Sequence, residues 1–213
     1  HTVLAPLWRK AVMSADDEQV IISEFGSLLT ADDHFHRMSA MLYAERPASA
    51  GRVAKLANSE PLFAAWSAAI RKDAKMAALL KAVPAEAQKR AGYQFAKALW
   101  LRKTGKLKDA AKVMAEAPQA AASLIDPDAW WNERRILARS LWDAGQTKLA
   151  YKTAFMHAAQ SPTSAAEAEF HAGWIALRAL KDPKLAEAHF TRLLSISTTP
   201  QSLSRGYYWL GRS

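Results

Sequence analysis

One helical pattern recurs nearly three times between residues 126 and 213, and it constrains the fold more than any other feature of the sequence. Each copy combines an apolar helix, a short turn and a second helix with small residues four positions apart. The turns are predicted at Gly145 and at Asp182-Pro183, and the third copy begins at Tyr207. Small residues at i and i+4 share one helix face, so two helices can approach closely. The pattern predicts helical hairpins that bury their apolar faces by stacking on neighbouring hairpins, as in solenoid proteins.

The spacing of the copies is not constant. Trp174 and Trp209 are 35 positions apart, whereas Gly105 and Gly145 are 40 apart. This drift favours an irregular superhelix over a strict tetratricopeptide array. We predict an all-α fold, a right-handed, tetratricopeptide-like α-superhelix (solenoid) over residues 1–213, with irregular helices over 1–125 and regular hairpins over 126–213. Only four residues follow Trp209, so the last hairpin lacks its second helix, and we expect the chain to be a piece of a longer protein.

Start and stop signals predict about 11 to 13 helices. Capping pairs that open helices are expected at Ser14 with Asp17, Thr30 with Asp33, and Ser164 with Glu167. Short helices are predicted over residues 48–57, 60–72 and 74–82, a longer one from Pro84 to Gly105, and its hairpin partner over 106–116. Nowhere does the period-2 alternation of a β-strand occur.

The charge of the chain is concentrated in its middle third. The net charge is +9, and residues 47–125 alone carry 14 Lys and Arg against 5 Asp and Glu. A basic surface can attract nucleic acid, anionic lipid or an acidic polymer, although solvated helix faces have the same composition. No cysteine is present, so disulfides and thiolate metal sites are excluded. No basic start followed by an apolar run marks a signal peptide at the beginning of these residues, so if the protein is exported we expect its targeting segment to have been removed before this numbering begins. No apolar run is long enough for a transmembrane segment.

Catalytic and metal-binding motifs are missing from the sequence. No phosphate-binding loop and no nucleophile elbow occurs. Glu133 is the most suggestive carboxylate, because it lies among Trp and Arg residues, but we interpret it as a salt-bridged residue early in a helix. His34 and His36 fall on opposite sides of a helix, and His157, His171 and His189 are isolated in sequence. We therefore predict no catalytic residue, no metal and no cofactor.

Basic and aromatic residues alternate over residues 84–112, a composition typical of single-strand nucleic-acid binders. The basic residues surround most of the helix, however, and no nucleic-acid-binding module motif is present, so no nucleic acid is expected as a partner. Most Trp residues follow a buried helical stripe and are predicted to be packing residues. The candidates for contact with a glycan or a partner are Lys97, Arg102, Lys103, Arg134, Arg135, Tyr207 and Tyr208.

Three strings in the hairpin region resemble the superhelical portion of the soluble lytic murein transglycosylases. They are residues 128–145 (DAWWNERRILARSLWDAG), 168–178 (AEFHAGWIALR) and 204–212 (SRGYYWLGR). Residues 29–34 (LTADDH) and the helix over 37–46 also resemble that family, so the likeness spans most of residues 29–213. Individually these strings are helical-repeat patterns, and it is their order that carries the resemblance.

The resemblance implies a periplasmic protein of the cell wall. Members of the family cleave the peptidoglycan glycan strand to 1,6-anhydromuramyl ends, using a Glu in a Glu-Ser motif of a lysozyme-like domain that follows the superhelix. This sequence contains no Glu-Ser dipeptide and no GLMQ string, so no catalytic residue is carried over. The resemblance thus implies a non-catalytic scaffold domain, inactive alone, whose partners are peptidoglycan and its own C-terminal catalytic domain.

Two other functions are compatible with the pattern. A solenoid can be a protein–protein interaction module whose concave face binds a partner protein. A basic nucleic-acid binder is the third hypothesis, and it predicts binding to oligonucleotides that weakens steeply with salt.

Overall fold

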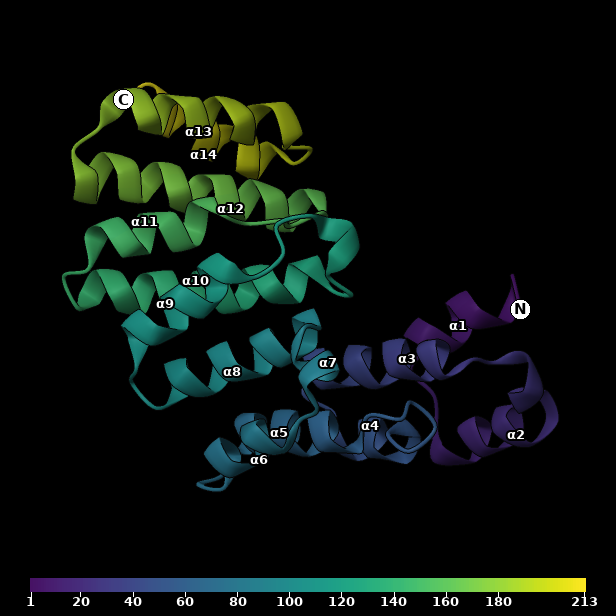
Figure 1. Ribbon diagram of the computed structural model, residues 1–213. Helices are drawn as coiled ribbons and strands as arrows, with labels where there is room; N and C mark the ends of the chain where they lie inside the picture. The colour runs from purple at the N-terminus through teal and green to yellow at the C-terminus, as the bar shows by residue number, and fades with distance from the viewer. The chain divides into compact units, whose positions relative to one another are not determined.

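The computed structural model describes residues 1–213 and is all-helical, with fourteen α-helices and no strand (Figure 1). The predicted all-α class is confirmed. The expected number of helices was too low, partly because α1 (Leu4–Lys10) lies where no start signal was recognised. No helix combines the length and the hydropathy needed to cross a lipid bilayer.

The chain divides into two compact units, residues 1–97 and residues 98–213, with the boundary inside α8 (Ala91–Lys103). The first unit contains α1, α2 (Ala15–Phe25), α3 (Ala31–Tyr43), α4 (Pro47–Val53), α5 (Glu60–Arg71), α6 (Met76–Ala82) and α7 (Ala85–Gln88). Helix α3 packs against α1, α4 and α5. An aromatic cluster fills this core, in which the Tyr43 ring lies 4.7 Å from that of Trp66 and 4.8 Å from that of Phe95.

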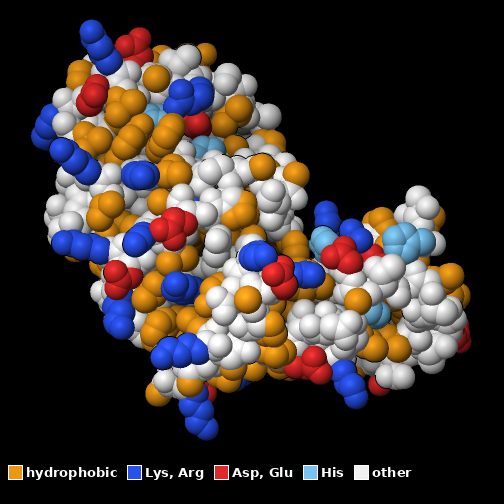
Figure 2. Space-filling view, in the orientation of Figure 1, with side chains coloured by type: hydrophobic (Ala, Val, Ile, Leu, Met, Phe, Trp, Pro, Cys, Tyr) orange, Lys and Arg blue, Asp and Glu red, His pale blue; other side chains and the backbone are white.

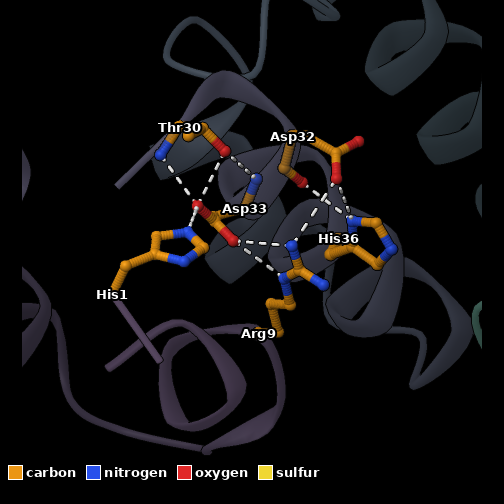
Figure 3. A network of polar contacts seen from close by, with 6 residues as sticks. All are labelled: His1, Arg9, Thr30, Asp32, Asp33 and His36. Carbon is orange, nitrogen blue, oxygen red and sulfur yellow. Dashed lines mark hydrogen bonds and ion pairs between the residues drawn. The ribbon is translucent and has the colours of Figure 1, made fainter. Parts of the chain in front are cut away.

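A buried carboxylate fixes the start of α3. Thr30 and Asp33 form the predicted capping box, because the Thr30 hydroxyl accepts from the Asp33 N–H and Asp33 accepts from the Thr30 N–H at 2.8 Å. Asp33 also accepts from Arg9 Nε at 2.8 Å and contacts His1 Nε2 at 2.9 Å (Figure 3). Burial alone would raise the pKa of Asp33, but the hydrogen bonds from Thr30 and Arg9 outweigh burial and lower it. The carboxylate therefore joins α1 to α3 as well as capping α3.

The second unit continues with α9 (Leu107–Glu116), α10 (Pro127–Asp143), α11 (Thr147–Phe155), α12 (Pro162–Ile175), α13 (Pro183–Ile196) and α14 (Pro200–Leu210). A π-helical turn, Ala176–Leu180, extends α12. Each helix from α10 to α14 packs against the next one in the chain. The small and apolar positions predicted to face neighbouring helices, Ala150, Ala154, Ala186 and Phe190, are fully buried.

The hairpins of this unit share one turn geometry. Gly105 and Gly145 have φ of +81° and +73°, and Lys181 occupies the corresponding place with φ of +59°. The N–H of the residue after each glycine donates to the carbonyl five positions earlier. Lys106 donates to Leu101 and Gln146 donates to Leu141, both at 2.8 Å. This is the Schellman termination, which uses a left-handed residue to satisfy the last carbonyls of a helix. The turns predicted at Gly145 and Asp182-Pro183 are confirmed.

Two boundary predictions were wrong. Helix α12 is capped by Ser161, whose hydroxyl accepts from the Ser164 N–H, so Ser164 with Glu167 is not a capping box. The long helix expected from Pro84 to Gly105 is divided into α7 and α8. Near the start of α8 the Gly92 backbone lies so close to the Trp66 ring that a Cβ atom would meet it at 2.6 Å, a tertiary contact that local propensity does not reveal.

Candidate functional site

A cavity of about 410 Å³ lies among α9, α10 and α11 of the second unit, and four of its ten lining residues are basic. We call it the basic pocket and define it by Lys108, Lys112, Arg134 and Lys152, together with the apolar side chains Ala111, Ala115, Leu149 and Met156 and the polar Thr153 and Glu116. Four cations thus face one carboxylate. Over the helices of residues 98–213 visible in Figure 2, Lys and Arg side chains are more frequent than Asp and Glu.

The three lysines of the pocket come from two helices. Lys108 and Lys112 are four residues apart on α9 and therefore share one face of that helix. Lys152 is on α11, which packs against α9. All three side chains are exposed, and none of them forms an ion pair within the protein. Their charges are therefore available to a ligand.

Arg134 is the buried member of the pocket, with only 3% of its surface exposed. Its guanidinium donates to the Met114 carbonyl at 2.6 Å and to the Thr153 carbonyl at 3.4 Å. Both carbonyls lie in last helical turns, of α9 and α11, where the helix dipole is negative. No carboxylate pairs with Arg134, and burial lowers its pKa to about 10, so it stays cationic at neutral pH. Two of its five N–H groups are used in this way, which leaves three without a protein acceptor.

Two other predicted contact residues are engaged in ion pairs. Arg102 on α8 pairs with Glu133 on α10, with Nη2 2.9 Å from Oε2. Arg135 on α10 pairs with Glu167 on α12 at 2.8 Å. The interpretation of Glu133 as a salt-bridged residue is confirmed. Arg102 and Arg135 join the first helices of successive hairpins, so the ion pairs give both residues a structural role.

The remaining candidates do not gather around the basic pocket. Lys97 is half-buried on α8 in the first unit, and Lys103 is half-buried near the end of the same helix. Tyr207 and Tyr208 are 65% and 58% exposed on α14, and the Arg212 guanidinium carbon lies 5.7 Å from the Tyr208 ring centroid. Of the seven predicted contact residues, Arg134 alone is among the residues that line the basic pocket.

Two of the three histidines that are isolated in sequence, His157 and His189, meet at one carboxylate. Glu169 on α12 lies 2.6 Å from His189 Nδ1, 3.4 Å from His157 Nε2 and 3.0 Å from Arg192 Nε. Burial would raise the pKa of Glu169, but the hydrogen bonds from these side chains outweigh it and hold that pKa far below its ordinary value. His171 contacts a different group, the Glu167 carbonyl, at 2.9 Å. These contacts tie the segment after α11 to α12 and α13, and no group of three His, Asp or Glu side chains has the arrangement of a metal site.

Buried aromatic rings pack the second unit, as the helical stripe predicts. Trp130 and Trp131 are buried, and the Trp131 indole N–H donates to Glu167 at 3.0 Å. Trp142 and Trp174 lie on successive first helices with ring centroids 4.4 Å apart. All four rings therefore pack against neighbours within the unit, Trp130 and Trp131 fully buried and Trp142 and Trp174 half-buried.

Sequence reasoning missed the place of Lys152 and of the apolar residues beside it. Lys108 and Lys112 belong to the recognised basic segment, and their i, i+4 spacing predicts a shared face. Lys152 lies 40 positions after Lys112, and only the packing of α11 on α9 brings the two helices together. The repeat spacing of about 40 residues was the available signal. Comparisons with protein-family models, curated proteins and solved structures found no match.

Proposed function

We propose that the chain is a non-catalytic scaffold domain of a periplasmic lytic transglycosylase, an enzyme that cleaves peptidoglycan glycan strands to 1,6-anhydromuramyl ends. The scaffold would hold a lysozyme-like catalytic domain on the strand and contact peptidoglycan itself. Its helical hairpins would stack as an irregular right-handed solenoid, with residues 126–213 as the regular part.

One observation carries this proposal: the three strings that resemble the transglycosylase family occupy corresponding helices. Residues 128–145 form α10 and its turn, residues 168–178 lie in α12 and its π-helical extension, and residues 204–212 run from α14 into the two residues that follow it. Helices α10 and α12 are the first helices of successive hairpins. That placement supports reading the strings as copies of one repeat.

Contacts between the first helices of successive hairpins support the stacking of hairpins. The pairs Arg102–Glu133 and Arg135–Glu167 connect residues 31 and 32 positions apart, from α8 to α10 and from α10 to α12. The Trp142–Trp174 contact also spans 32 positions. Contacts of this kind between neighbouring units are what join the repeats of a solenoid.

Two surface features suit contact with peptidoglycan. Tyr207 and Tyr208 expose aromatic rings with polar hydroxyl groups, and such rings combine apolar contact area with hydrogen bonding. The excess of Lys and Arg over residues 47–125 would attract the carboxylates of peptide stems.

Co-sedimentation with purified insoluble peptidoglycan tests the proposal directly. We expect the 213-residue chain to sediment with peptidoglycan at low salt, and to release no anhydromuropeptide detectable by mass spectrometry. The double variant Tyr207→Ala/Tyr208→Ala should bind at least threefold more weakly. Val20→Ala, which trims another exposed apolar side chain, serves as the control and should bind normally.

A chain that stays in the supernatant at low salt would overturn the proposed contact with peptidoglycan. Release of an anhydro product by the purified chain would overturn its non-catalytic role. A single stoichiometric protein partner, captured without any binding to peptidoglycan, would instead support the interaction-module hypothesis.

A further inference from the structure

We propose that the basic pocket is a binding site for a ligand that carries at least two carboxylate or phosphate groups on a short aliphatic stem. The site would function in any larger protein that contains this chain, and it does not depend on a role in peptidoglycan cleavage. Its evidence is the combination of uncompensated charge, volume and apolar lining.

The pocket has an excess of positive charge. Lys108, Lys112 and Lys152 have no ion-pair partner, and the single carboxylate of the lining, Glu116, pairs with none of them. Four cations around one cavity repel one another, and a bound anion would relieve that repulsion. A ligand with a single charge would neutralise only part of it, so the excess of cations favours a polyanion.

Arg134 gives the pocket a fixed donor that surface lysines alone would not provide. The two carbonyls of Met114 and Thr153 hold its guanidinium in place. A guanidinium positioned in this way presents its remaining N–H groups in a planar fork, which matches the oxygens of a carboxylate or phosphate. Because Arg134 is almost fully buried, its bond to an oxyanion would be less screened by water than one from an exposed lysine.

The size and apolar lining of the pocket define the rest of the ligand. About 410 Å³ is within the range of sites for small organic ligands and is far larger than a single oxyanion requires. Ala111, Ala115, Leu149 and Met156 supply apolar contacts between the basic groups. These side chains would pack against an aliphatic stem, and the lysines would hold its charged ends.

Calorimetric titration of the full chain at low salt, with two probes, tests the site. The probes are triglutamate, which presents several carboxylates on aliphatic stems, and inorganic pyrophosphate. We expect at least one of them to bind. Stronger binding of triglutamate would identify a carboxylate ligand, and stronger binding of pyrophosphate would identify a phosphate ligand.

Charge-reversal variants separate a built site from general attraction. Lys112→Glu/Lys152→Glu should weaken the binding of the preferred probe at least tenfold. The matched control, Lys181→Glu/Lys184→Glu, makes the same change in net charge at exposed positions outside the pocket and should change binding less than twofold. Circular dichroism would establish that both variants are folded. The proposal is overturned if neither probe binds at low salt, or if the two double variants weaken binding equally.

Discussion

Arg135 in α10 donates to the Glu167 carboxylate in α12 at 2.8 Å, and Arg102 in α8 forms an ion pair with Glu133 in α10, so each Arg bridges the first helices of two successive hairpins. The two ion pairs connect corresponding helices of successive hairpins but differ in burial. The Glu133 side chain is 5% exposed, whereas that of Glu167 is 30% exposed. One Arg–Glu ion pair therefore has an almost fully buried carboxylate, and the other has a carboxylate that is partly exposed to water.

This difference in burial predicts that two matched substitutions lower the free energy of unfolding by unequal amounts. Arg102→Met would leave Glu133 buried without its partner, and we expect the free energy of unfolding to fall by about 3 kcal/mol. Arg135→Met would leave Glu167 partly solvated, so we expect a fall of no more than about 1 kcal/mol. Denaturant unfolding monitored by circular dichroism would measure both. Equal losses would contradict the assignment of the difference to burial.

The capping network of α3 predicts that the stability of the first unit depends strongly on the Asp33 carboxylate. Asp33→Ala removes the acceptor shared by Thr30, Arg9 and His1 (Figure 3), and we expect it to destabilise the protein by about 2 to 3 kcal/mol. The neighbouring Asp32 is 56% exposed, so Asp32→Ala is the control and should have little effect. Thermal unfolding would compare the two variants. The cap is not critical if both melt at the temperature of the wild type.

The close packing of α12 on α13 predicts that a glycine in a helix cannot be replaced by alanine. A Cβ atom on Gly173 would lie 2.8 Å from the Phe190 ring and 3.1 Å from His189 Cβ. Alanine normally stabilises a helix relative to glycine. Here we expect the overpacking to outweigh that gain and to lower the free energy of unfolding by about 1 to 3 kcal/mol. Gly26→Ala is the control, because its new methyl would meet nothing closer than 3.9 Å. A Gly173→Ala variant as stable as the wild type would show that α13 can move away.

Two buried histidines predict that the protein loses stability in mild acid. Burial lowers the pKa of His34 and of His171 below the ordinary value of 6.5. In the unfolded chain these side chains take up protons near pH 6.5, whereas the folded protein resists protonation until lower pH. Their contribution to stability is thus complete above pH 6.5 and declines as the pH falls from there toward the lowered pKa values.

Denaturant unfolding at several pH values between 7.5 and 5 would measure this loss. We expect His34→Leu and His171→Leu each to flatten the dependence of the unfolding free energy on pH, whatever their effect at pH 7.5. An unchanged slope in both variants would show that other groups cause the acid sensitivity.

The local signals in the sequence were sufficient for most of the helices. Thr30 with Asp33 capped a helix as predicted, because both partners of a capping box lie within one turn. Gly145 ended a helix for the same reason, since the left-handed conformation is a local demand. The capping pair predicted at Ser164 failed because Ser161 already satisfies the first helical turn, and Glu167 is held instead by Trp131 and Arg135 from another helix.

The sequence by itself determined that the chain forms paired helices with apolar faces, because helix periodicity, caps and turns are encoded within a few residues of one another. The tertiary structure alone decided which of the predicted basic residues stay available. It placed Arg102 and Arg135 in ion pairs, and it left Arg134 without a carboxylate beside Lys112 and Lys152. The physical reason is that burial and pairing depend on side chains 18 to 40 positions away, whose approach follows from the packing of helices and not from any local preference.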